Sequence, residues 1–198
     1  MRSVPLIIVT LLSVGAAVAG EIREFNVPTL ERLGNELIRA SQRPDRGATD
    51  SVRKRAIQTA RAALQAQLFN LRYDYVVLND PDGKRLLVYA IAAVEKTDEV
   101  ILAGHFRVTV SPDGTKAERV DALSKSLRSS GPIKSGSPTG DDTVALFLIQ
   151  IVSNKPVETL IYTANLAKKP IYVRAPDGRT WVVGEGKMKV DTTKPSRQ

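Results

Sequence analysis

The sequence predicts an α+β fold in which N-terminal helices pack on a curled antiparallel sheet of about six to seven strands. Three observations indicate this fold. Apolar residues recur at helical spacing before residue 72, and after it they alternate or run on as in strands. The tripeptide Pro-Asp-Gly occurs three times, each time between two strand-like runs. The chain of 198 residues is long enough for one domain with a buried core.

The first nineteen residues have the parts of a secretory signal peptide. Arg2 precedes an apolar run over residues 4–14, and small residues follow. Ala17 and Ala19 suit a cut after Ala19, which we expect; a cut after Gly20 is the alternative. A membrane anchor would need about 20 apolar residues, which this run lacks. We therefore expect a periplasmic or secreted protein without a stable membrane span after cleavage.

Two amphipathic helices are predicted in the N-terminal part of the chain. The first covers residues 28–40, with Asn26 as its N-cap and apolar residues three and four apart. The second covers residues 50–70, with Asp50 as its N-cap and basic side chains on its polar face. A stretch with Pro and Gly, residues 42–47, separates them. We interpret the basic face of the second helix as the solvated side of a core helix.

Three hairpins are predicted at the Pro-Asp-Gly turns. Proline presets φ for such a turn, Asp bonds to the nearby backbone, and Gly accepts a positive φ. The turns begin at Pro81, Pro112 and Pro176, and they pair residues 73–79 with 85–94, 100–110 with 116–122, and 170–175 with 179–184. The hairpins supply most strands of the expected sheet.

Two runs, residues 86–94 and 144–152, are apolar at nearly every position, which predicts strands covered on both faces. The N-terminal helices can cover one face only. The other face requires a third helix, a second sheet or a partner subunit, so a structural homo-oligomer is one hypothesis. We place a third helix over residues 156–168, although residues 159–164 also fit a strand.

Two segments lack the pattern of regular structure. Residues 124–142 are rich in Ser, Gly, Pro and Lys, which predicts a long flexible loop. Residues 185–198 are expected to form a basic flexible tail. A single exported domain over residues 20–184 remains. Its order of helices followed by an antiparallel meander is similar to that of cystatin-like and related helix-on-sheet folds, an analogy of fold that implies no function.

The sequence contains no motif with a catalytic mechanism. It has no cysteine and one histidine, too few ligands for a usual zinc site, and no Gly-x-Ser-x-Gly elbow. His105 is the one acid or base candidate, and alternation predicts it half exposed beside Arg107. We expect no catalytic residue, no cofactor and no metal. The alternative is a hydrolase acting on an envelope polymer.

The charge favours an anionic partner. The formal net charge is +8, and it falls to +7 when Arg2 is removed with the signal peptide. The candidate interaction residues lie in the loop and the last hairpin: Lys125, Arg128, Lys134, Arg174, Arg179 and Trp181. We predict a non-catalytic binding or accessory protein of the cell envelope, exported to a bacterial periplasm. Its expected partner is an envelope protein or an anionic surface, and we do not expect nucleic acid.

Overall fold

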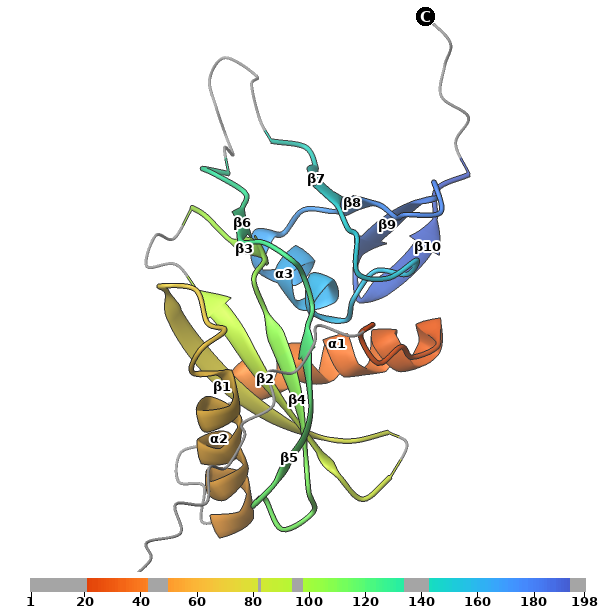
Figure 1. The fold of residues 1–198 in the computed structure, drawn as a ribbon. Coiled ribbons are helices and arrows are strands. Elements are labelled where there is room, and N and C mark those ends of the chain that lie inside the picture. The colour runs from red at the N-terminus through yellow and green to blue at the C-terminus, as the bar shows by residue number, and fades with distance from the viewer. Residues whose placement is uncertain (1–20, 43–49, 82, 94–97, 134–142, 193–198) are drawn as a thin grey trace, which may run out of the picture.

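The computed structural model has an α+β fold (Figure 1). It describes residues 21–42, 50–81, 83–93, 98–133 and 143–192. Within these ranges the chain forms three helices and ten strands. No helix in the described part of the chain is long and apolar enough to span a bilayer. The predicted signal peptide, the stretch at 43–47 and Lys134 lie outside the described residues.

The first sheet is antiparallel and contains two of the predicted hairpins. Its strands, in the order β1-β2-β4-β5, are β1 (Arg72–Asn79), β2 (Leu86–Ala93), β4 (Phe106–Val110) and β5 (Ala117–Ala122). The turn between β4 and β5 requires glycine at position 114 for two reasons. Gly114 has a φ of +78°, and a Cβ there would lie 2.5 Å from the Val52 carbonyl oxygen.

Helix α2 (Ser51–Leu64) covers one face of this sheet. Asp50 caps it, as predicted, by accepting from the backbone N–H groups of Val52 and Arg53. The small side chains of Ala56 and Ala60 let the helix approach the sheet closely, and both are fully buried. The predicted end at residue 70 is wrong, because the chain turns after Leu64 towards the start of β1.

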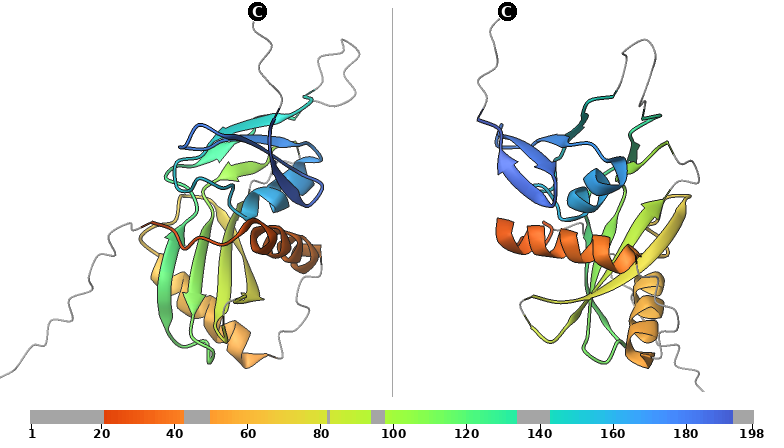
Figure 2. Two further views of the ribbon diagram at one scale, coloured as in Figure 1. Left: turned by 90° about the vertical axis from the view of Figure 1, so that its right-hand side faces the viewer. Right: turned by 180° about the vertical axis from the view of Figure 1, so that it is seen from behind.

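Helices α1 (Val27–Gln42) and α3 (Thr159–Ala167) lie on the opposite side of the first sheet and contact each other. Asn26 caps α1, because its Oδ1 accepts from the Thr29 N–H at 2.9 Å. The helix at α3 is confirmed against the strand alternative. Figure 2 shows α1 running between the first sheet and the second.

The second sheet has the order β10-β9-β8-β7. Its strands are β7 (Leu146–Ile149), β8 (Ile171–Arg174), β9 (Thr180–Gly184) and β10 (Lys187–Val190). The predicted hairpin is confirmed as β8–β9. Strand β7 runs parallel to β8, because α3 carries the chain back to the same end of the sheet. The prediction of a single curled antiparallel sheet is therefore wrong. The prediction of a flexible tail is also wrong in part, because β10 lies within it.

A third sheet pairs β3 (Ile101–Ala103) with β6 (Arg128–Ser129). The predicted strand 100–110 breaks at Gly104, where φ is +121°, so that its first part leaves the first sheet. Strand β6 lies inside the predicted loop 124–142, which is thus partly regular. Residues 134–142 of that loop are outside the described part of the chain.

The first sheet separates two hydrophobic cores. One joins its α1 side to α3 and the second sheet, and the other lies under α2. Strand β2 is buried on both faces, as its continuous apolar run predicted. The same prediction is wrong for β7, where Phe147 is 60% exposed and Ile149 is 66% exposed.

Candidate functional site

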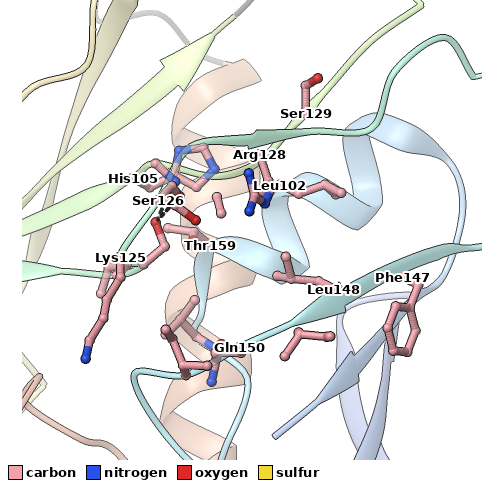
Figure 3. Close-up of a pocket in the computed structure, with 17 residues that line it drawn as sticks. Leu102, His105, Lys125, Ser126, Arg128, Ser129, Phe147, Leu148, Gln150 and Thr159 are labelled. Carbon is pink, nitrogen blue, oxygen red and sulfur yellow. Dashed lines mark hydrogen bonds between the residues drawn. The ribbon is translucent and has the colours of Figure 1, made fainter.

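A groove of about 460 Å³ lies between β6 and β7 (Figure 3). The close-up shows Lys125 and Arg128 on the β6 side and Leu148 on the β7 side, with Thr159 between them. Its volume falls in the range of about 300–1,000 Å³ typical of ligand sites. Lys125 and Arg128, two of the predicted interaction residues, thus lie in one groove with β7, a strand that was expected to be covered on both faces.

The β7 wall is the edge of the second sheet. The Leu146 N–H donates to the Pro170 carbonyl at 2.9 Å, and the Gln150 N–H donates to the Arg174 carbonyl at 3.0 Å. In a parallel pair, alternate residues direct both backbone groups to the partner strand. The backbone groups of Phe147 and Ile149 therefore face away from β8, and no described strand pairs with them.

This edge also exposes apolar side chains. Val144 is 80% exposed and Ile151 is 56% exposed, beside the exposed Phe147 and Ile149. Natural edge strands are usually protected by Lys, Pro or a bulge, and residues 144–151 contain neither Lys nor Pro. An apolar, unprotected edge is a template for another extended chain.

The two cations of the groove have no described counterion. Lys125 and Arg128 are exposed and form no ion pair with any residue of the described ranges. The Arg128 Nη1 atom makes one long contact, 3.4 Å, with the Leu127 carbonyl. No Asp or Glu is among the described residues that line the groove. The groove therefore carries a positive potential beside its apolar wall.

A buried hydroxyl lies at the bottom of the groove. Thr159, the first residue of α3, lines it and is 1% exposed. Its Oγ1 atom has no hydrogen-bond partner among the described residues. Buried polar groups are normally satisfied, so this hydroxyl is an exception, and its oxygen is itself buried beneath the groove surface.

His105 also lines the groove, but it is buried rather than half exposed. Its Nδ1 accepts from the Ala92 N–H at 3.1 Å, which leaves the proton on Nε2 to donate to the Ile101 carbonyl at 3.1 Å. The expectation of exposure was wrong because α1, α3 and the second sheet cover this face of the strand. Both ring nitrogens hold backbone groups, so neither is free to act as a base.

His105 should make the protein less stable in acid. Burial lowers the pKa of His105 from 6.5 to about 4. Between these values the unfolded chain binds the proton and the folded chain does not, so stability is lost as pH falls from 6.5 towards 4, by about 3 kcal/mol in total. Urea unfolding at pH 7 and pH 4.5 measures this loss. The His105→Gln variant, which cannot titrate, should lose less; equal losses would refute the prediction.

Arg107, predicted on the solvent-exposed face of its strand, is fully buried in an ionic cluster. Its guanidinium contacts Asp121 at 2.8 Å and Glu158 at 2.6 Å. The Tyr89 hydroxyl donates to the same Glu158 carboxylate at 2.7 Å. Burial opposes the charge of Arg107, but the two carboxylates raise its pKa above the ordinary value. The cluster ties the first sheet to α3 through Glu158, and Asp121 also pairs with Arg119 at 2.6 Å.

The remaining predicted residues lie elsewhere. Trp181 is 5% exposed and belongs to the main core, so it is not a surface stacking residue. Arg179 lies over its ring at 5.5 Å and pairs with Asp177. Arg174 is exposed on β8 and donates to Thr180. None of these residues lines the groove.

A second groove, of about 680 Å³, is bordered by lysines. They come from the end of α3 and from β10: Lys168, Lys169, Lys187 and Lys189. Lys187 pairs with Glu31 at 3.0 Å, and Glu185 also lines this groove. The helix end there presents carbonyl oxygens, which repel anions. This groove is thus a poorer anion site than the one between β6 and β7.

Sequence reasoning missed the role of β7 and of Thr159. A continuous apolar run looks the same whether the chain covers both faces or leaves one for a partner. The absence of Lys and Pro in an edge strand is a signal only once the strand is known to be an edge. Thr159 carries no sequence signal, because the environment of its hydroxyl depends on packing.

The comparisons with known proteins provide no relative. No protein-family model, curated protein or solved structure matches this chain significantly. The analogy with cystatin-like folds therefore stays a prediction. Within the described ranges, no group of three or more His, Cys, Asp or Glu side chains could hold a metal ion.

Proposed function

We propose that this protein is an exported, non-catalytic binding protein of the cell envelope that captures an extended segment of a partner polypeptide between β6 and β7. The observation that carries the proposal is the exposed apolar edge of β7 beside the groove. The signal peptide predicted at residues 1–19 supports export. The periplasm is the compartment we propose.

Strand addition accounts for both affinity and selectivity. The outward backbone groups of Phe147 and Ile149 would pair with the added segment, whatever its sequence. The exposed side chains of these residues would select apolar residues at alternate positions of the segment. The groove volume suits a short extended segment rather than a folded domain.

The hydrolase and homo-oligomer hypotheses are affected differently by these observations. The hydrolase hypothesis relied on His105 or on an acid in a cleft. The ring nitrogens of His105 are both occupied by backbone groups, and no Asp or Glu is among the described residues that line the groove. The homo-oligomer hypothesis shares the exposed edge of β7, because a second copy could also pair there. The test must therefore separate a partner segment from a second copy.

Display of random 12-residue peptides against immobilised residues 20–198 tests the proposal. We expect enrichment of peptides with alternating apolar residues. Ile149→Lys, which places a charge on the exposed edge, should weaken the enriched peptides at least about tenfold, measured by fluorescence polarisation. Because Ile149 is 66% exposed, the variant should fold normally, which circular dichroism checks.

Leu166→Lys is the matched control. Leu166 is 51% exposed and lies on α3 outside the groove, so this variant should bind as the wild type does. Failure to enrich any peptide, or equal binding by Ile149→Lys, would contradict the proposal. A wild-type dimer that Ile149→Lys converts to a monomer in sedimentation would assign the edge to a second copy instead.

A further inference from the structure

The charges of the groove restrict what its occupant can carry. Lys125 and Arg128 border it, and the described lining contains no acidic residue to neutralise them. A concave site between low-dielectric walls concentrates such a potential. Two cations without a counterion among the described residues therefore favour an occupant with a negative group.

The N-terminus of α3, which begins at Thr159, favours the same charge. The neighbouring Thr163 hydroxyl, one turn along α3, bonds to the Thr159 carbonyl at 3.0 Å and to the Ile101 carbonyl at 3.3 Å. The Thr159 hydroxyl has no such partner in the described chain, although it is equally buried. It lies at the N-terminus of a nine-residue helix, whose positive end also favours an anion.

The rest of the lining is mainly apolar, which argues against a free inorganic anion. Leu102, Leu148, Ile149 and Val157 are among the lining residues. A phosphate ion would leave these side chains uncovered. An extended peptide covers them and can still present one carboxylate to Arg128, whose planar guanidinium suits that group.

Building on the proposed function, we propose that the captured segment is an apolar strand with one internal acidic residue, Asp or Glu. Its carboxylate pairs with Arg128 and Lys125 near the N-terminus of α3. Its apolar side chains cover Leu148 and Ile149. The groove thus selects acidic, apolar, extended segments of envelope polypeptides.

Two arrays of capped eight-residue peptides test this inference. Both consist of Val, Thr, Ile and Phe, with either Glu or Gln fixed at the fourth position, and both ends are blocked. We expect the Glu peptides to bind about tenfold more tightly than their Gln partners at low salt. The preference should shrink as salt is raised, because exposed charges are screened.

Three variants test which residues cause the preference for Glu over Gln peptides. Arg128→Gln should bring the ratio of Glu to Gln binding close to one, whereas Lys169→Gln, which removes a charge from the second groove, should leave it unchanged. Thr159→Val keeps the shape of the side chain and removes the hydroxyl. It should leave the ratio of Glu to Gln binding unchanged and Tm unchanged or raised, because the lost hydroxyl is buried and has no partner in the described chain.

The outcomes separate this inference from the proposed function. Equal binding of Glu and Gln peptides, with both weakened by Ile149→Lys, would refute the preference for an acidic residue. The proposal that β7 captures an extended segment would still hold. Stronger binding of peptides with a free C-terminus than of capped ones would move the carboxylate to the chain end and overturn the internal residue. No binding by either array, together with no enrichment in the display experiment, would refute strand capture itself.

Discussion

Replacing Arg107 by alanine is expected to lower the free energy of unfolding by about 3–5 kcal/mol. Arg107 is fully buried, and its guanidinium is the cation between the carboxylates of Asp121 and Glu158. It also donates to the Arg23 carbonyl at 2.5 Å, which holds the N-terminal segment against the sheet. Without the guanidinium, two carboxylates remain buried without their shared cation.

Equilibrium unfolding in urea measures this effect. The matched control is Arg72→Ala, because Arg72 and Asp74 form an exposed ion pair at 3.0 Å, and such pairs contribute about 0–1 kcal/mol. If the two variants lost similar stability, the buried cluster would not be what holds α3 to the first sheet.

Gly34→Val should destabilise the protein by about 3 kcal/mol, at the upper end of the usual cost of overpacking. Gly34 lies where α1 crosses α3. A Cβ there would be 2.6 Å from the Ile161 Cβ and 2.8 Å from the Glu158 carbonyl oxygen. Neither atom is the end of a flexible side chain, so the helices would have to separate. Removing a helical glycine would return at most about 1 kcal/mol.

Thermal unfolding of two controls tests the cause. Gly83→Val should change stability by less than about 1 kcal/mol, because a Cβ at Gly83 meets nothing within 4 Å. Gly34→Ala, which adds the Cβ alone, should also lose stability, because that atom by itself meets the Ile161 Cβ and the Glu158 carbonyl oxygen. A Gly34→Ala variant as stable as the wild type would show that the helix crossing is not the source.

Elements whose formation depends on neighbouring residues could be predicted from the sequence. The Pro-Asp-Gly turns after Pro112 and Pro176 place their hairpins correctly, because turn geometry depends on a few adjacent residues. The caps Asn26 and Asp50 start their helices for the same reason. Lys125 and Arg128 stood out by charge alone.

Which faces of the strands are covered depends on long-range packing and could not be predicted from the sequence. Arg107 and His105 alternate with apolar residues, as on a wet face, yet α1, α3 and the second sheet bury that face. Burial is possible because Asp121 and Glu158, distant in the chain, supply the charges that Arg107 needs.

Strand β7 shows the opposite case. Its apolar run predicts coverage on both sides, but the crossover through α3 places it at an edge. The position of Lys187–Val190 as β10 likewise depends on pairing with β9, which no local signal of the basic tail required. Coverage and edges are properties of long-range pairing, so the groove between β6 and β7, and Thr159 within it, exist only in the folded chain.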